Sequence, residues 1–161
     1  MQETENQYFH DSLGRLLSLE GVVEAMLEFM QAVPDRRYKI IIGTDSQPGQ
    51  ETDFVSAIVI HRERNGGRYW WRRFRAPSFR VMRDRIYQEA ILSLKVAQAL
   101  LEILKTKKHL DLDLEIHLDV GFGGETRSMI QEVVGMVRGS GFEVRTKPES
   151  FGATKVADRH V

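Results

Sequence analysis

The chain contains no cysteine among its 161 residues. This absence excludes disulfide bonds, thiolate nucleophiles and cysteine-ligated zinc, so catalysis would have to use carboxylates, histidine, serine or lysine. Long hydrophobic runs are also absent, since no apolar stretch approaches the roughly 18 residues that a membrane-spanning helix needs. The N-terminus is polar and acidic and lacks the basic start and apolar stretch of a secretory signal. We therefore expect a cytoplasmic protein without a membrane anchor.

The length and composition are those of a globular domain. Hydrophobic residues make up 42% of the chain and charged residues 29%, which is ordinary for a water-soluble protein. The length is close to the commonest size for one compact domain and is sufficient to bury a core. We therefore expect one domain over residues 1–161, with an N-terminal helical extension over 1–35 and a core over 38–161.

The net charge is zero, but the charges are unevenly distributed along the chain. Residues 61–85 contain nine arginines and only two acidic residues, and aromatic residues are interleaved with them. This composition is typical of a surface that contacts phosphates and stacks on bases. A charged edge strand that resists aggregation is the alternative. The candidate nucleic-acid contacts in this segment are Trp71, Arg72, Arg73 and Arg75.

Hydrophobic periodicity and turn residues predict a helix, three strands, and then alternating helices and strands. An α/β fold with helices packed on a mixed five-stranded sheet satisfies this order. The predicted elements are a helix over 19–32, capped by Ser18, strands over 38–44, 54–61 and 69–74, a helix over 82–106, a strand over 114–120, a helix over 125–138, a strand over 142–146 and a last short helix over 153–161.

Four acidic residues lie where separate elements begin or end. Asp45 follows the first strand, Asp119 ends the fourth, and Asp158 lies near the C-terminus. If the first and fourth strands are parallel, Asp45 and Asp119 become neighbours at the carboxyl edge of the sheet, where ligand sites of such sheets lie. Glu89 falls on the apolar face of its helix, where a carboxylate is costly unless a cation or hydrogen bonds compensate it. The four residues are candidate ligands of a divalent metal.

Each carboxylate also has a purely structural explanation. Asp45 could terminate its strand as an Asx-turn residue. Asp119 could cap a helix or bond a loop, and Asp158 could be a first-turn residue favoured by the helix dipole. The alternative partners of Glu89 are the cations of Lys39, Arg73 and Arg75.

Three motifs resemble those of the bacterial ribonuclease H-like family typified by YkuK. They are Ile-Ile-Gly-Thr-Asp-Ser-Gln at 41–47, Ile-His-Leu-Asp-Val-Gly at 116–121 and Ala-Thr-Lys-Val-Ala-Asp-Arg-His at 153–160. The resemblance covers residues 38–161 and implies a ribonuclease H-like fold, with a three-strand antiparallel meander, two parallel strands and an extra N-terminal helix. The order of predicted elements agrees with that fold.

The resemblance also implies an activity and a site. It carries the catalytic and metal-binding carboxylates onto Asp45, Glu89, Asp119 and Asp158, which would hold two Mg²⁺ or Mn²⁺ ions. Phosphodiester bonds of RNA, an RNA/DNA hybrid or structured DNA would then be hydrolysed to a 5′-phosphate and a 3′-hydroxyl. Many ribonucleases H have Asp-Gly-Ser in the first strand, whereas Ser46 and Gln47 follow Asp45 here, so specificity for hybrids is not implied.

Two further residues and two alternative functions complete the expectations. Lys155 and His160 are candidates for phosphate contact or proton transfer. Nucleic acid is the expected partner, and a homo-oligomer is compatible with the sequence. The alternative functions are a non-catalytic nucleic-acid-binding module and a scaffold or oligomerisation element on the same fold.

Overall fold

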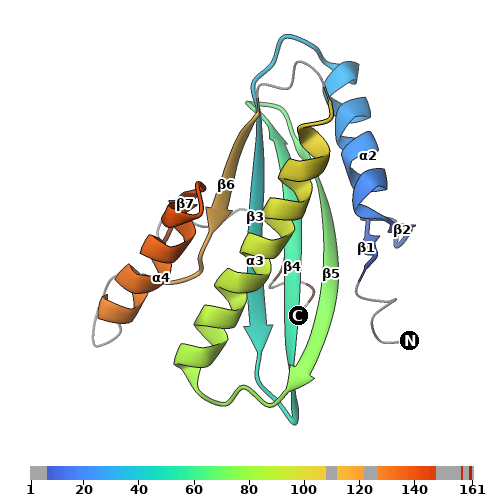
Figure 1. Ribbon diagram of the computed structural model, residues 1–161. Coiled ribbons are helices and arrows are strands. Elements are labelled where there is room, and N and C mark those ends of the chain that lie inside the picture. The colour runs from blue at the N-terminus through green and yellow to red at the C-terminus, as the bar shows by residue number, and fades with distance from the viewer. Residues whose placement is uncertain (1–6, 108–111, 122–126, 148–156, 158–159, 161) are drawn as a thin grey trace.

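The computed structural model describes residues 7–107, 112–121, 127–147, 157 and 160. The predicted order of helices and strands is confirmed for these residues (Figure 1). The last predicted helix, over 153–161, lies outside them except for Ala157 and His160, which are both helical. The elements are β1 (Phe9–His10), β2 (Leu16–Leu17), α2 (Leu19–Ala32), β3 (Tyr38–Gln47), β4 (Glu51–Arg62), β5 (Gly67–Pro77), α3 (Met82–Leu104), β6 (Asp113–His117), α4 (Arg127–Gly139) and β7 (Glu143–Arg145).

One mixed sheet has the strand order β2-β1-β5-β4-β3-β6-β7. Strands β3, β4 and β5 form the predicted antiparallel meander, and β6 runs parallel to β3 with β7 parallel to β6. The predicted number of five strands is wrong, because a short N-terminal hairpin adds two strands at the edge of β5. Strands of two residues are too short to show the alternation by which strands are recognised in a sequence.

Local chemistry explains the N-terminal hairpin. The Asp11 Oδ1 accepts hydrogen bonds from the backbone amides of Leu13 (2.9 Å) and Arg15 (2.8 Å). Gly14 follows with a φ of +81°, a conformation that glycine adopts without strain. Residues 9–17 therefore form a β-hairpin, and the N-terminal extension is not purely helical.

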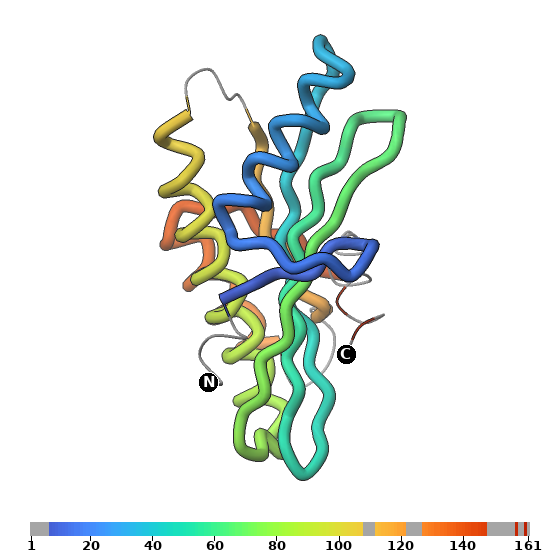
Figure 2. Tube along the Cα trace, turned by 90° about the vertical axis from the view of Figure 1, so that its right-hand side faces the viewer, coloured from blue at the N-terminus to red at the C-terminus, as the bar shows by residue number. Residues whose placement is uncertain are grey.

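Helices α2, α3 and α4 cover one face of the sheet, as Figures 1 and 2 show from two directions. The main core lies between them, where Val22, Val23 and Met26 of α2 and Ile40 and Ile42 of β3 are fully or almost fully buried. The opposite face of the sheet, called the outer face below, has a second, smaller buried cluster that includes a residue from the C-terminal part of the chain. Successive residues of a strand point to opposite faces, so this two-layer arrangement fixes where each polar side chain of β3 can point.

Helix α2 begins and ends where the sequence predicts. Ser18 is its N-cap, and the Ser18 hydroxyl accepts a hydrogen bond of 3.1 Å from the amide of Gly21. Pro34 follows shortly after its last residue, Ala32. Within the described part of the chain, no helix has the length and apolar character needed to cross a membrane.

Two strand boundaries differ from the predictions in a way that matters for the site. Strand β3 continues to Gln47, so Asp45 lies inside the strand and pairs with Val55 of β4. Asp has a low strand propensity, but backbone pairing with β4 extends β3 beyond its apolar residues to Gln47. Strand β6 ends at His117, so Asp119 lies two residues beyond it.

Candidate functional site

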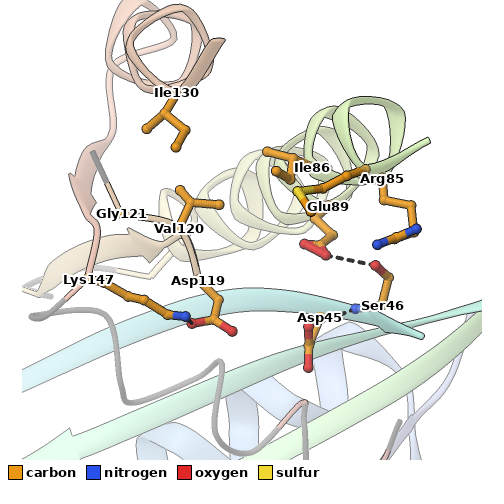
Figure 3. A pocket seen from close by; sticks show the side chains of 11 residues that line it. Asp45, Ser46, Arg85, Ile86, Glu89, Asp119, Val120, Gly121, Ile130 and Lys147 are labelled. Atoms are coloured by element: carbon orange, nitrogen blue, oxygen red, sulfur yellow. Dashed lines mark hydrogen bonds and ion pairs between the residues drawn. The ribbon is translucent and has the colours of Figure 1, made fainter. Parts of the chain in front are cut away.

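A pocket of about 320 Å³ opens at the carboxyl ends of the parallel strands β3 and β6 (Figure 3). Three of the four predicted metal-binding carboxylates line it, those of Asp45, Glu89 and Asp119. The fourth, Asp158, lies outside the described residues. The described residues that line it are Asp45, Ser46, Met82, Arg85, Ile86, Glu89, Asp119, Val120, Gly121, Ile130 and Lys147.

The parallel pairing of β3 with β6 brings Asp45 and Asp119 to one end of the sheet. The last paired residues are Gly43 of β3 and His117 of β6, and each carboxylate follows two residues later. This is the arrangement that the sequence predicted for parallel strands, with both acidic residues at a shared carboxyl edge.

Two successive hydrogen bonds join α3 to β3 and place Glu89. The hydroxyls of Thr44 and Ser93 lie 2.8 Å apart in the core, and Thr44 makes a second contact of 2.8 Å with the Ser56 hydroxyl. One helical turn earlier on α3 and two residues later on β3, the Ser46 hydroxyl donates a 2.8 Å hydrogen bond to Oε1 of Glu89. Residues four apart on a helix and two apart on a strand share a face, so the two bonds lie on the same interface.

The pKa of the Glu89 carboxyl is raised from its ordinary value of 4.5 to about 8, and burial is the largest cause. The negative charges of Asp45 and Asp119 contribute to this rise, whereas the Ser46 hydrogen bond and the Arg85 guanidinium act in the opposite direction. A carboxyl in this environment favours either a proton or a nearby cation. The pocket therefore holds an inward-facing acid at the position where the sequence predicted a metal ligand.

The predicted alternative for Glu89, an ion pair with a neighbouring cation, is not formed. Lys39 pairs with Glu115 at 3.2 Å, and Arg75 pairs with Asp53 at 2.9 Å. Arg73 donates instead to the backbone carbonyl of His160. The three cations that the sequence offered as partners of Glu89 are therefore directed elsewhere, and the Arg85 guanidinium is the cation that acts on its pKa.

Asp45 and Glu89 lie on opposite sides of β3. Because Ser46 points towards α3, the alternation of the strand directs Asp45 to the outer face, as Figure 3 shows. The Oδ1 atom of Asp45 also accepts a hydrogen bond of 2.9 Å from the amide of Ser46. Asp45 is therefore a strand residue, not the Asx-turn residue of the alternative explanation.

Lys147 is a pocket residue that sequence reasoning missed. Its Nζ lies 3.2 Å from Oδ1 of Asp119, in an ion pair whose side chains are 59% and 37% exposed. The backbone amide of Lys147 also donates to the carbonyl of Val120 at 2.8 Å, which ties the residues after β6 to those after β7. The available signal was its position after β7, at the same carboxyl edge as Asp119.

The described residues contain no group of three acidic or histidine side chains close enough together to hold a metal ion as they stand. The chemistry of the pocket nevertheless fits a hard cation. Its candidate ligands are carboxylate oxygens, which suit Mg²⁺ and Mn²⁺ better than zinc or copper. A bound cation would also stabilise the ionised form of Glu89, which burial and the charges of Asp45 and Asp119 disfavour.

A second charged cluster, on the outer face, was not predicted. Glu115 is 3% exposed and contacts Lys39, the Nε2 of His117 (3.0 Å) and Arg145 (3.5 Å). Although burial alone would raise the pKa of Glu115, the hydrogen bonds from His117 and Lys39 lower it. Burial lowers the pKa of His117, which favours a neutral imidazole that donates to Glu115. The cluster satisfies a buried carboxylate with His117 of its own strand and with Lys39 and Arg145 of the two neighbouring strands.

The predicted nucleic-acid contacts have protein partners. Arg72 is half-buried with its guanidinium 4.8 Å from the centre of the Phe9 ring, and burial lowers its pKa. Trp71 stacks on the ring of His160, and Arg73 reaches the same residue. Arg75 is exposed and pairs with Asp53. The structure thus brings Trp71, Arg73 and His160 together, while Lys155 lies outside the described residues.

Comparison with known proteins places the chain in a family. Residues 21–161 match the family model described as ribonuclease H-like, so the match includes most of α2. The chain is also 30% identical over 158 residues to the protein described as uncharacterized protein YkuK of Bacillus subtilis (strain 168), covering 89% of this chain and 90% of that protein. No solved structure matches the chain. Together with the mixed α/β fold and its shared carboxyl edge, these matches show that the protein belongs to the ribonuclease H-like family.

Proposed function

We propose that the protein is a divalent-metal-dependent nuclease that hydrolyses phosphodiester bonds in RNA, an RNA/DNA hybrid or structured DNA. One observation carries the proposal: the carboxylates of Asp45 in β3, Glu89 in α3 and Asp119 just after β6 line one pocket at the carboxyl edge of the parallel strands. Family membership supports the same reading, because it suggests a nuclease-like fold that binds nucleic acid.

The proposed ligands are Asp45, Glu89, Asp119 and Asp158, with Mg²⁺ or Mn²⁺ as the cofactor. Two such ions supply activation of the attacking water and stabilisation of the departing oxygen. Within the pocket, Ser46 orients Glu89 and stabilises its ionised form through the hydrogen bond at 2.8 Å. Lys147 competes with a metal cation for Asp119, and a Lys147 side chain displaced by that cation could contact a substrate phosphate. Arg85 adds a second positive charge to the same lining.

A non-catalytic nucleic-acid-binding module is the second candidate function. Two observations favour it: Lys147 already neutralises Asp119, and Asp45 and Glu89 point to opposite sides of β3. In this case ion pairs and hydrogen bonds would stabilise the pocket, and the cationic side chains of Arg85 and Lys147 would bind phosphate without cleavage.

Cleavage assays separate the two candidates. The purified protein is incubated with labelled single-stranded RNA, RNA/DNA hybrid, and linear and branched DNA in Mg²⁺ or Mn²⁺, beside an Asp45→Asn variant. An Asp53→Asn variant is the matched control, since Asp53 lies on the adjacent strand and pairs with Arg75 outside the pocket. We expect metal-dependent cleavage that Asp45→Asn abolishes and Asp53→Asn retains. If the protein binds nucleic acid but cleaves none of these substrates, the non-catalytic module is established instead.

A further inference from the structure

Trp71 stacks on histidines from both ends of the chain. Its ring centre lies 4.4 Å from that of His10, with an angle of 16° between the planes, and 4.3 Å from that of His160, with an angle of 11°. His10 is the cross-strand partner of Trp71 in the pairing of β1 with β5. Trp71 therefore holds the N-terminal hairpin and the C-terminal part of the chain on one side chain.

Arg73 forms a second attachment to the same C-terminal residue. Its Nη2 donates a hydrogen bond to the backbone carbonyl of His160, and its guanidinium lies 5.6 Å from the centre of the Trp71 ring. The Nε of Arg73 is buried and has no hydrogen-bond partner among the described residues, so the side chain is turned into the protein and not out to solvent.

Ala157 shows where on the sheet these C-terminal residues lie. It is completely buried against Val55 and Ala57 of β4, in the cluster of the outer face. Val55 pairs with Asp45 on one side and with Arg73 on the other. Directly paired residues of a sheet point to the same face, so Asp45, Val55 and Arg73 form one row on the outer face. Ala157 thus packs in the middle of a row that begins at a proposed metal ligand and ends at Arg73.

The geometry points to a role for Trp71 and Arg73 as positioning residues, which hold His160, and with it Ala157, on the face of the sheet that carries Asp45. Through this anchor they set the metal affinity of the site without contacting metal or nucleic acid. The inference rests on the proposed function, because Asp158, the proposed fourth ligand, lies between Ala157 and His160 in the sequence. His10 makes the N-terminal hairpin part of the same anchor.

Amide hydrogen exchange tests the anchor independently of metal and activity. The full-length Arg73→Gln and Trp71→Leu variants are compared with the unmodified protein in metal-free buffer, with Arg75→Gln as the control on the same strand. Loss of the charged hydrogen bond in Arg73→Gln, and of the ring stacking in Trp71→Leu, should each increase exchange of the C-terminal peptide roughly tenfold. Exchange should be unchanged in Arg75→Gln, whose partner is Asp53. Equal exchange in all four proteins would overturn the anchor.

A double-mutant cycle that measures Mn²⁺ affinity tests whether Arg73 acts on metal binding through Asp158. We expect Arg73→Gln and Asp158→Asn each to weaken Mn²⁺ binding several-fold, and the double variant to bind no more weakly than Asp158→Asn alone. Additive losses would show that Arg73 does not act through Asp158. A loss of oligonucleotide affinity with unchanged exchange would identify Arg73 as a nucleic-acid contact and overturn the inference. If the unmodified protein binds no Mn²⁺, the proposed function and the Asp158 step both fail, while the exchange result still judges the anchor.

Discussion

The Ser46 hydroxyl donates a hydrogen bond of 2.8 Å to Glu89, and this contact joins the end of β3 to the first turns of α3. It is the hydrogen bond that favours the ionised form of Glu89, against burial and the charges of Asp45 and Asp119. The Ser46 hydroxyl is therefore the largest of the contributions that favour an ionised Glu89.

Replacing Ser46 with alanine should weaken metal binding. Without the hydroxyl, the pKa of Glu89 rises further. Because Glu89 must lose its proton to bind a cation, the free energy needed for that deprotonation at pH 7 increases. Hydrogen bonds to charged groups contribute about 1.5–3 kcal/mol, so we expect a loss of roughly tenfold or more in Mn²⁺ affinity at pH 7 by calorimetry. Ser46→Thr keeps a hydroxyl and should retain most of the affinity. Equal affinity in the alanine and threonine variants would show that the hydrogen bond has no such role.

The stability of the metal-free protein should fall as the pH rises from about 4.5 to about 8. In this window Glu89 is ionised in the unfolded chain but still protonated in the folded protein, so the folded state binds the extra proton. Above pH 8 both states are ionised and the loss is complete. A shift of this size corresponds to a few kcal/mol.

The Glu89→Gln variant tests this pH dependence, because glutamine cannot ionise. Urea unfolding between pH 5 and pH 9 should show a decline in the unmodified protein and a flatter profile in the variant, which should be the more stable protein at pH 9. Added Mg²⁺ should restore stability at high pH only where Glu89 is present, since a ligand that binds the folded state alone stabilises it. Parallel pH profiles for the two proteins would contradict the raised pKa.

Removing the charge of Lys147 should separate metal binding from phosphate binding. In Lys147→Met, Asp119 loses a competing cation, so we expect tighter Mn²⁺ binding together with weaker oligonucleotide binding. Folding stability should change by less than about 1 kcal/mol, because the ion pair is exposed. Lys105→Met, which breaks the exposed pair with Glu102, is the control and should change neither affinity. Weaker Mn²⁺ binding in Lys147→Met would refute the proposed competition.

The Thr44 hydroxyl should be important for stability, not for chemistry. Thr44→Val preserves the shape of the side chain but leaves the buried hydroxyls of Ser56 and Ser93 without this partner. Unsatisfied buried polar groups cost about 1–3 kcal/mol each, and urea unfolding should show a loss of that order. Thr106→Val, in an exposed position after α3, is the matched control and should lose much less. A comparable loss in both variants would show that the buried hydroxyl network contributes little.

Much of the fold could be predicted because its signals are local. The apolar stripe and Ser18 cap of α2, the turn residues before β5 and the alternation of β6 all lie in short stretches of sequence. The N-terminal hairpin escaped prediction because each of its strands has only two residues, and its stability comes from the side chain of Asp11 and from pairing with β5. The end of β3 was misplaced because pairing with β4, not residue preference, keeps Asp45 extended.

The sequence by itself determined the chemistry available to this protein: the carboxylates of Asp45 and Asp119, no cysteine, and a Glu89 on the apolar face of its helix. Only the tertiary structure decided the partners of those groups. Lys39 forms an ion pair with Glu115 and not with Glu89, and Lys147 forms one with Asp119. Trp71 stacks on histidines from two distant segments. The reason is physical: residue type and spacing fix the face of an element on which a side chain lies, whereas contacts between distant residues depend on strand register and on which elements pack together.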